Sequence, residues 1–191
     1  MDRRELLKMI VAATGAAMIG LPALVQGQAP AAGMKTPFSD ADVGTLDEIA
    51  ETILPRTATP GAKDAGAGLF MARFVTDCYT ARQQATFRAG LADIDKRAGG
   101  RFVALAPQAR TELLRALDAE ARKHAVDVTE TGTAEEGEAM PHYFTMLKQL
   151  AIFGFFTSKV GATEVLRYVA VPGRYDGDLA YVPGTPAWGT S

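Results

Sequence analysis

Cysteine and histidine are scarce in this chain, and their scarcity limits its chemistry. Cys78 is the single cysteine among 191 residues, so the chain cannot form a disulfide with itself. It follows Phe74 by four residues, on the same helical face, and is expected either to be buried or to pair with another chain. The two histidines, His124 and His142, lie far apart in the sequence and outside any His-Glu-x-x-His spacing, so the sequence predicts no metal site.

Motifs of catalysis and cofactor binding are missing as well. The chain has no Cys-x-x-Cys-His haem motif and no Gly-x-Ser-x-Gly nucleophile turn. Gly66 and Gly68 do not complete a dinucleotide fingerprint, because Met71 stands where the third glycine belongs. His142 beside Tyr143 is either an acid–base pair or the solvent-facing start of a helix. The sequence therefore predicts no catalytic, cofactor-binding or metal-binding residues, and a chain that does not catalyse by itself.

An excess of charge of one sign is also lacking. The chain has 20 lysines and arginines against 22 aspartates and glutamates, a net charge of −2 at pH 7. A domain that binds nucleic acid carries a basic patch or stripe. The balance of charges therefore predicts no nucleic-acid partner.

The charges at the start of the chain are distributed unevenly. Two adjacent arginines stand near the first residue, and no charged residue occurs between Lys8 and Lys35. A positively charged N-terminal region, an apolar region and small residues before the cleavage site are typical of a secretory signal. The arginine pair favours the twin-arginine route. The sequence thus predicts a periplasmic protein exported by that route. The residues that form the predicted export signal are Arg3, Arg4, Leu6, Leu7 and Lys8.

The extent of this leader leaves one alternative open. Ala29-Pro30-Ala31 supplies small residues for cleavage after Ala31, which predicts a signal peptide over residues 1–31. A permanent membrane anchor is the alternative, because Met9–Val25 is at the short end of the roughly 17–25 residues that a spanning helix needs. Glycine and proline within Met9–Val25 dilute its hydrophobicity, which favours the cleaved signal.

The remaining part of the chain, about 160 residues, is long enough for one domain with a hydrophobic core. Ser39 and Asp42 form a capping pattern, and apolar residues then recur at helical spacing until Pro55 ends the helix. The same spacing predicts further helices around residues 69–79, 87–94, 107–117, 141–156 and 163–168. No convincing run alternates apolar and polar residues. The sequence therefore predicts an all-α fold, with a single compact helical domain over residues 32–170.

Long segments rich in turn-forming or polar residues join these helices. Residues 55–66 are dense in proline, glycine and threonine, and residues 127–138 form an acidic connector. Residues 171–191 carry too much proline and glycine for regular structure. They are predicted to form an extended aromatic C-terminal tail.

Two segments carry a more specific pattern. The first is Ile53-Leu54-Pro55-Arg56-Thr57, followed by Thr59-Pro60-Gly61-Ala62 and Asp64-Ala65-Gly66. The second comprises Phe144, Leu147-Lys148, Gly154-Phe155-Phe156-Thr157-Ser158, Tyr168 and Val171-Pro172-Gly173-Arg174-Tyr175-Asp176-Gly177. Together, in this order and behind a twin-arginine leader, the two segments resemble the gluconate 2-dehydrogenase subunit 3 family.

The resemblance implies an accessory role in an oxidoreductase complex. Members of that family are small, non-catalytic subunits of periplasmic sugar and polyol dehydrogenases. Their large partner is a flavin-dependent oxidoreductase of the glucose–methanol–choline type, which implies FAD in the partner and no cofactor in this chain. A multihaem cytochrome c commonly completes the complex, which implies haem c in that subunit and allows attachment to the membrane through the complex. This chain would escort the folded catalytic subunit through the twin-arginine translocase and stabilise it.

A surface for that partner is predicted where apolar side chains occur on a constrained backbone. The prolines of residues 55–66 reduce the entropy lost on docking. Three aromatic residues within residues 153–156 cannot all face one core, and the aromatic residues of the tail either fold back on the helices or anchor the partner. The predicted interface residues are Pro55, Arg56, Pro60, Gly61, Phe153, Phe155, Phe156, Tyr175, Tyr181 and Trp188.

One hypothesis of a different class remains. The chain would then be a free-standing periplasmic helical protein that binds a small ligand or acts alone as an enzyme. A flavoprotein without its own leader, encoded beside this chain, would favour the accessory subunit over that alternative.

Overall fold

The computed structural model describes residues 36–131, 140–171, 173, 177–180 and 182–189.

Capping boxes set where two of the helices begin. Helix α3 (Asp40–Ile53) starts at Ser39, whose hydroxyl accepts the Asp42 N–H while the Asp42 carboxylate accepts the Ser39 N–H at 2.9 Å. Helix α5 (Ala81–Arg97) starts in the same way at its N-cap, Thr80. The predicted start of α3 at Ser39 and its end before Pro55 are confirmed.

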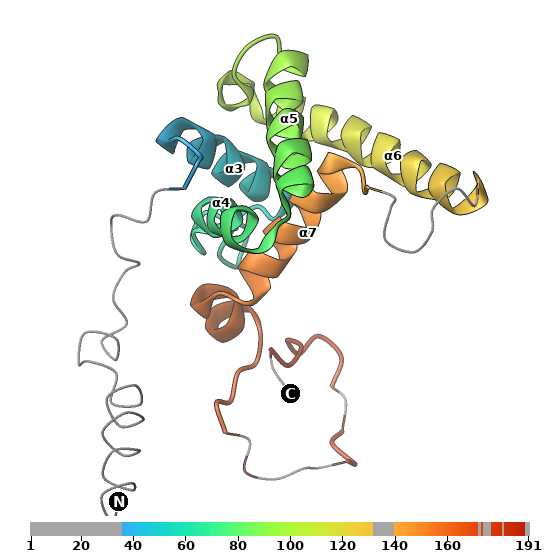
Figure 1. The fold of residues 1–191 in the computed structure, drawn as a ribbon. Helices are drawn as coiled ribbons and strands as arrows, with labels where there is room; N and C mark the ends of the chain where they lie inside the picture. The colour runs from blue at the N-terminus through green and yellow to red at the C-terminus, as the bar shows by residue number, and fades with distance from the viewer. Residues whose placement is uncertain (1–35, 132–139, 172, 174–176, 181, 190–191) are drawn as a thin grey trace, which may run out of the picture. The chain divides into compact units, whose positions relative to one another are not determined.

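The other elements are also helical. They are α4 (Ala67–Cys78), a 3-10 turn η1 (Phe102–Ala104), α6 (Pro107–Thr131), α7 (Tyr143–Phe156) and a π-helical turn η2 (Gly161–Val165) (Figure 1). Pro107 is the first residue of α6, as predicted, because a proline lacks only an N–H that this position leaves unused. The residues that the structure describes contain no strand, and the prediction of an all-α fold is confirmed.

Two boundaries differ from the predictions. Helix α6 continues to Thr131, so the first part of the predicted 127–138 connector is helical, and residues 132–139 lie outside the described residues. The helix predicted around 163–168 is instead the turn η2. A bond from the Leu166 N–H to the Gly161 carbonyl, 3.0 Å long, closes this turn.

Helix α7 is the central element of the fold. It packs against α3, α4, α5 and α6 (Figure 1). A helix that is apolar on most of its surface is expected to be buried in this way. The core residues that α7 contributes are Phe144, Met146, Leu147, Leu150, Ala151, Gly154 and Phe155.

Helix α4 packs closely on α3 through its small residues. A Cβ atom added to Gly68 would lie 2.5 Å from the Asp47 Oδ1 and 2.7 Å from the Asp47 backbone nitrogen. Ala67, Gly68, Met71, Ala72 and Val75 face the core, and the two aromatic rings of α4, Phe70 and Phe74, are only half-buried. Cys78 is exposed, so the expectation that it is buried is wrong, because Cys78 is the last residue of α4 and lies beyond Val75, the last buried residue of that helix.

Candidate functional site

The Glu51 carboxylate fixes both ends of the 55–66 loop. Its Oε1 accepts the backbone N–H of Arg56 and its Oε2 accepts the backbone N–H of Lys63, both at 2.9 Å. Because Glu51 belongs to α3, the loop is tied to the helix that precedes it. Hydrogen bonds to a charged acceptor are stronger than neutral ones, so this single side chain orders much of the loop.

Asp64 fixes the middle of the same loop. Its carboxylate accepts the Gly61 N–H at 2.8 Å and forms an ion pair with the Arg56 guanidinium. The hydrogen bond from Gly61, together with the pairing with Arg56, holds the pKa of Asp64 below its usual value. Asp64 is therefore ionised at neutral pH, and the loop keeps one internal charge pair.

Glu48 connects the loop to the start of α6. It forms ion pairs with Lys63 of the loop and with Arg110 of α6. Arg110 also donates to the carbonyl oxygens of Leu105 and Val103, at 2.9 and 2.5 Å. The loop, α3 and the segment that leads into α6 are thereby cross-linked by charged groups.

The four predicted interface residues of this loop occupy different environments. Pro55 and Arg56 are exposed, Pro60 is half-buried and Gly61 is buried. Gly61 therefore offers no surface to a partner; it instead leaves room for the Glu51 carboxylate, which would lie 2.5 Å from a Cβ atom at that position. Of the four predicted interface residues, Pro55 and Arg56 therefore lie on the outward surface of the loop.

Phe153 forms an exposed aromatic patch with two rings of α4. Its ring centroid lies 5.6 Å from that of Phe70 and 5.7 Å from that of Phe74, and both contacts are edge-on. Phe153 nevertheless keeps 47% of its surface exposed. Phe70, Phe74 and Phe153 are named here the aromatic patch. Rings held in place by one another lose little entropy on binding and provide a large contact area.

The other two aromatic residues at the end of α7 face elsewhere. Phe155 is only 3% exposed and belongs to the core, so it offers no surface to a partner. Phe156 is half-buried and packs edge-on against Phe155 at 5.0 Å. The three rings diverge because residues on a helix project at about 100° from one another.

Trp188 folds back on Arg167, which lies two residues after η2. The Arg167 guanidinium lies over its indole ring, 4.0 Å from the ring centroid. Two backbone bonds of 2.8 Å, from the Arg167 N–H to the Ala187 carbonyl and from the Gly189 N–H to the Arg167 carbonyl, hold this contact. The indole remains 48% exposed, so Trp188 is both attached to the domain and accessible.

Several predicted residues lie outside the residues that the structure describes. These are Tyr175 and Tyr181 of the tail, and Arg3, Arg4, Leu6, Leu7 and Lys8 of the leader. The segment Met9–Val25, for which a membrane anchor is the alternative, lies outside them too. Within the described ranges, no helix combines the length and the apolar composition that a membrane span requires.

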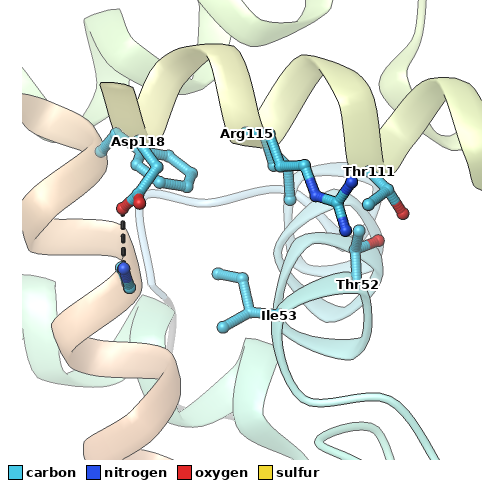
Figure 2. A pocket seen from close by; sticks show the side chains of 8 residues that line it. Thr52, Ile53, Thr111, Arg115 and Asp118 are labelled. Carbon is cyan, nitrogen blue, oxygen red and sulfur yellow. Dashed lines mark hydrogen bonds and ion pairs between the residues drawn. The ribbon is translucent and has the colours of Figure 1, made fainter. Parts of the chain in front are cut away.

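A groove lies between α3, α6 and α7. Its volume is about 230 Å³. Figure 2 shows Ile53 between two polar ends, one formed by Thr52, Thr111 and Arg115 and the other by Asp118. The residues that line this groove, named here the α3–α6–α7 groove, are Thr52, Ile53, Thr111, Leu114, Arg115, Asp118, Phe144 and Lys148.

At the second polar end of this groove, the Asp118 carboxylate interacts with two cations. Asp118 accepts a hydrogen bond from the Lys148 ammonium at 2.7 Å (Figure 2). It also pairs with Arg122 at 2.7 Å. The hydrogen bond from Lys148 is the main cause that lowers the pKa of Asp118. Lys148 belongs to the second sequence motif and Ile53 to the first, so the groove brings the two motifs together.

A second hollow, of about 250 Å³, lies beside the two histidines. The ring centroids of His124 and His142 are 5.9 Å apart, although 17 residues separate them in the sequence. The His124 Nε2 donates to the Met140 carbonyl at 3.0 Å, and the His142 Nδ1 accepts the Phe144 N–H at 3.2 Å. Burial, with the nearby His124, lowers the pKa of His142, so His142 is neutral and acts as the N-cap of α7.

Tyr143 stacks on His142 but directs its hydroxyl elsewhere. The ring centroids are 4.5 Å apart, and the Tyr143 hydroxyl donates to the Asp93 carboxylate at 2.6 Å. The same carboxylate accepts from Arg97 at 2.6 Å, and Arg97 pairs with Glu120 of α6 at 2.7 Å. Burial and the bond to Asp93 raise the pKa of Tyr143. The His142–Tyr143 pair therefore caps and cross-links helices, which is a structural rather than an acid–base arrangement.

No metal cluster is found in the part of the chain that the structure describes, where no three His, Cys, Asp or Glu side chains come together. Arg115 and Asp118, by contrast, are groove residues that sequence reasoning does not single out. A charged residue on the outer side of a long helix has the same sequence signature whether it faces solvent or a groove. Only the position of α3 opposite α6 distinguishes the two cases.

A model of a protein family matches most of this structure. The model is described as Gluconate 2-dehydrogenase subunit 3 and matches residues 40–173, more than half of the chain. Neither a curated protein nor a solved structure matches the chain. The matched range contains the 55–66 loop, the aromatic patch and the α3–α6–α7 groove, and it ends before Trp188.

Proposed function

We propose, on the premise that the chain belongs to the gluconate 2-dehydrogenase subunit 3 family, that it is the non-catalytic small subunit of a periplasmic flavin-dependent dehydrogenase complex. Membership makes the chain an accessory subunit of a dehydrogenase complex with a catalytic partner. The finer proposal is that this partner is of the glucose–methanol–choline type, carries FAD and oxidises a sugar or polyol. A multihaem cytochrome c subunit with haem c would accept the electrons.

The observation that carries this proposal is the family match over residues 40–173. The surfaces of the domain support it. Phe153 is exposed on the aromatic patch, Pro55 and Arg56 are exposed on a loop held by carboxylates, and Trp188 is half-exposed. Preordered loops and accessible aromatic rings are the features that give a docking surface high affinity.

We further propose that the chain escorts its partner across the membrane. A flavoprotein folds around its cofactor in the cytoplasm, so it must be exported in the folded state. The twin-arginine route carries folded proteins, and Arg3 and Arg4 provide the predicted signal for it. A catalytic subunit without a leader would be exported only while bound to this chain.

The test is to replace both arginines in the full chain by lysine, Arg3→Lys with Arg4→Lys, and to coexpress it with the catalytic subunit. Periplasmic dehydrogenase activity should fall to background while the catalytic subunit accumulates in the cytoplasm. Arg82→Lys with Arg88→Lys, two exposed positions on α5, is the matched control and should leave export unchanged. Normal periplasmic activity of the leader variant would contradict the escort role. Sugar oxidation by the purified chain alone would favour the free-standing enzyme instead.

A further inference from the structure

We propose that the α3–α6–α7 groove binds an acidic side chain, Asp or Glu, of the catalytic subunit. This inference rests on the proposed function and adds where, and by what chemistry, the partner is recognised. It is carried by three properties of the groove: its unpaired positive charge, its size and its position.

The charge of the groove is positive at an accessible point. The Arg115 guanidinium is exposed, and among the described residues none forms a hydrogen bond or ion pair with it. Figure 2 shows Arg115 directed toward Thr52 and Thr111 at one end of the groove. Both hydroxyls already donate to carbonyl oxygens of their own helices, so the guanidinium is the donor at this end of the groove that has no protein partner among the described residues. An arginine presents paired N–H groups that match the two oxygens of a carboxylate.

The opposite end of the groove does not cancel this charge. Lys148 and Arg122 share the single carboxylate of Asp118. Among the residues that line the groove, Arg115 and Lys148 are cationic and Asp118 is anionic, so the lining carries one net positive charge. The chain as a whole has a net charge of −2, so attraction of an acidic group is local to this site and is not a property of the entire surface.

The size and lining of the groove suit one side chain. Its volume of about 230 Å³ lies below the roughly 300–1,000 Å³ that is typical of small-molecule sites. Leu114 and Phe144 are buried and form its apolar part, together with the half-buried Ile53. The methylene groups of an acidic side chain would cover this apolar part while its carboxylate reaches Arg115. A small anion without an apolar stem would leave it uncovered.

The position of the groove connects it with the predicted interface. Ile53 precedes Pro55 by two residues, so the groove adjoins the start of the exposed 55–66 loop. The groove also lies within residues 40–173, the range that the family model matches. A partner seated on Pro55 and Arg56 is therefore close enough to place one side chain in the groove.

The test measures the dissociation constant of the full chain for its purified FAD-loaded catalytic subunit. Arg115→Glu should weaken binding at least tenfold, since it places a carboxylate where the partner's carboxylate would bind. Arg115→Lys keeps the charge without the paired donors and should lie between Arg115→Glu and the unchanged chain. Lys123→Glu makes a charge reversal on an exposed position of the same helix, outside the groove, and should bind like the unchanged chain.

Three outcomes would overturn the inference. Equal binding by Arg115→Glu and the unchanged chain would exclude the groove while leaving the proposed function intact. Absence of any binding by the unchanged chain would overturn the proposed function and the inference with it. In a second arm, the chain is titrated with sodium gluconate and followed by NMR. Saturable shifts at Arg115 that disappear in Arg115→Glu would assign the groove to a small sugar acid and not to the partner.

Discussion

At the scale of single residues, three acidic side chains of α3 bond to other segments of the chain. Acidic residues on one helix are usually solvated, yet Asp47, Glu48 and Glu51 of α3 all accept hydrogen bonds or pair with charges from other segments. The Asp47 Oδ1 accepts the Gly68 N–H at 2.7 Å, in the first turn of α4. Carboxylates at a helix N-terminus are stabilised by the exposed N–H groups there. One face of α3 thus organises the 55–66 loop and the start of α4.

Helix propensity and side-chain packing predict opposite effects on stability for the substitution Gly90→Ala. Within a helix, glycine is less favourable than alanine by roughly 0.5–1 kcal/mol, so propensity alone predicts that Gly90→Ala stabilises α5. A Cβ atom at Gly90 would instead overlap the Tyr143 ring and lie 2.6 Å from the Tyr143 Cβ. Overpacking of a core costs about 1–3 kcal/mol. We expect Gly90→Ala to lower the free energy of unfolding by about 1–2 kcal/mol, measured by urea denaturation.

Gly44 is the matched control for this substitution. It also lies within a helix, α3, and a Cβ atom there would have no neighbour within 4 Å. Gly44→Ala should therefore raise the free energy of unfolding by up to about 1 kcal/mol. Equal stabilisation by both substitutions would show that Tyr143 does not press on α5.

At the scale of elements, α7 depends on an unusual cap. Its N-cap is His142, which accepts the Phe144 N–H only while the Nδ1 carries no proton. Protonation would remove this acceptor and place a positive charge at the positive end of the helix dipole. His124 and Glu120 of α6 and Asp93 and Arg97 of α5 are the charged or titratable neighbours of His142.

The cap predicts a loss of stability on mild acidification. The pKa of His142 is lowered on folding, mainly by burial, from an ordinary value of about 6.5. The unfolded chain therefore takes up the proton first. Stability is complete above about pH 6.5 and falls as the pH drops toward the folded-state pKa. In His142→Asn, which keeps a capping acceptor without a titrating ring, this part of the pH dependence should be absent from unfolding curves.

A second substitution separates the cap from the charge. His142→Ala removes the acceptor and should cost about 0.5–2 kcal/mol at pH 7.5, whereas His142→Asn should cost less. If both variants lose the same stability at pH 7.5, the Nδ1 bond does not stabilise α7. If His142→Asn keeps the full pH dependence of the unchanged chain, another group causes it.

At the scale of the whole molecule, the helices of the domain pack around α7. Helix α7 contacts α3, α4, α5 and α6, and seven of its 14 residues are buried. The surface that we expect a partner to contact includes Phe153, in the last turn of α7, where Phe70 and Phe74 of α4 pack on it. In the described part of the chain after η2, Trp188 pairs with Arg167, two residues beyond that turn.

We therefore expect the tail to contribute to binding without supporting the fold. We expect removal of residues 182–191 to weaken binding of the catalytic subunit at least about thirtyfold, because loss of a desolvated aromatic anchor costs about 2 kcal/mol or more. The helical circular dichroism signal should be unchanged, since Trp188 packs on Arg167 and not on the core.

A point substitution identifies the residue responsible. Trp188→Ala should reproduce most of the effect of the deletion, and Phe153→Ala should weaken binding independently of it. Unchanged affinity after the deletion would mean that the interface lies on the helices alone. Loss of helical signal would mean that the tail supports the domain.

Features that depend on a few neighbouring residues follow from the sequence alone. Ser39 with Asp42 and Pro107 mark helix starts because the groups that they satisfy lie within one turn. The all-α class follows from the spacing of apolar residues along the chain, and the family from two ordered motifs. None of these conclusions requires knowledge of what packs against what.

Other features were decided only when the helices packed. The burial of Phe155, the exposure of Phe153 and Cys78, and the contact of Trp188 with Arg167 depend on which side of each element meets a neighbour. The same is true of the α3–α6–α7 groove, which joins residues from three helices that are distant in sequence. Periodicity predicts that a helix has an apolar side, but only the close approach of α4 to α3 at Gly68 decides that Met71 and Val75 enter the core while the Phe70 and Phe74 rings stay half-buried.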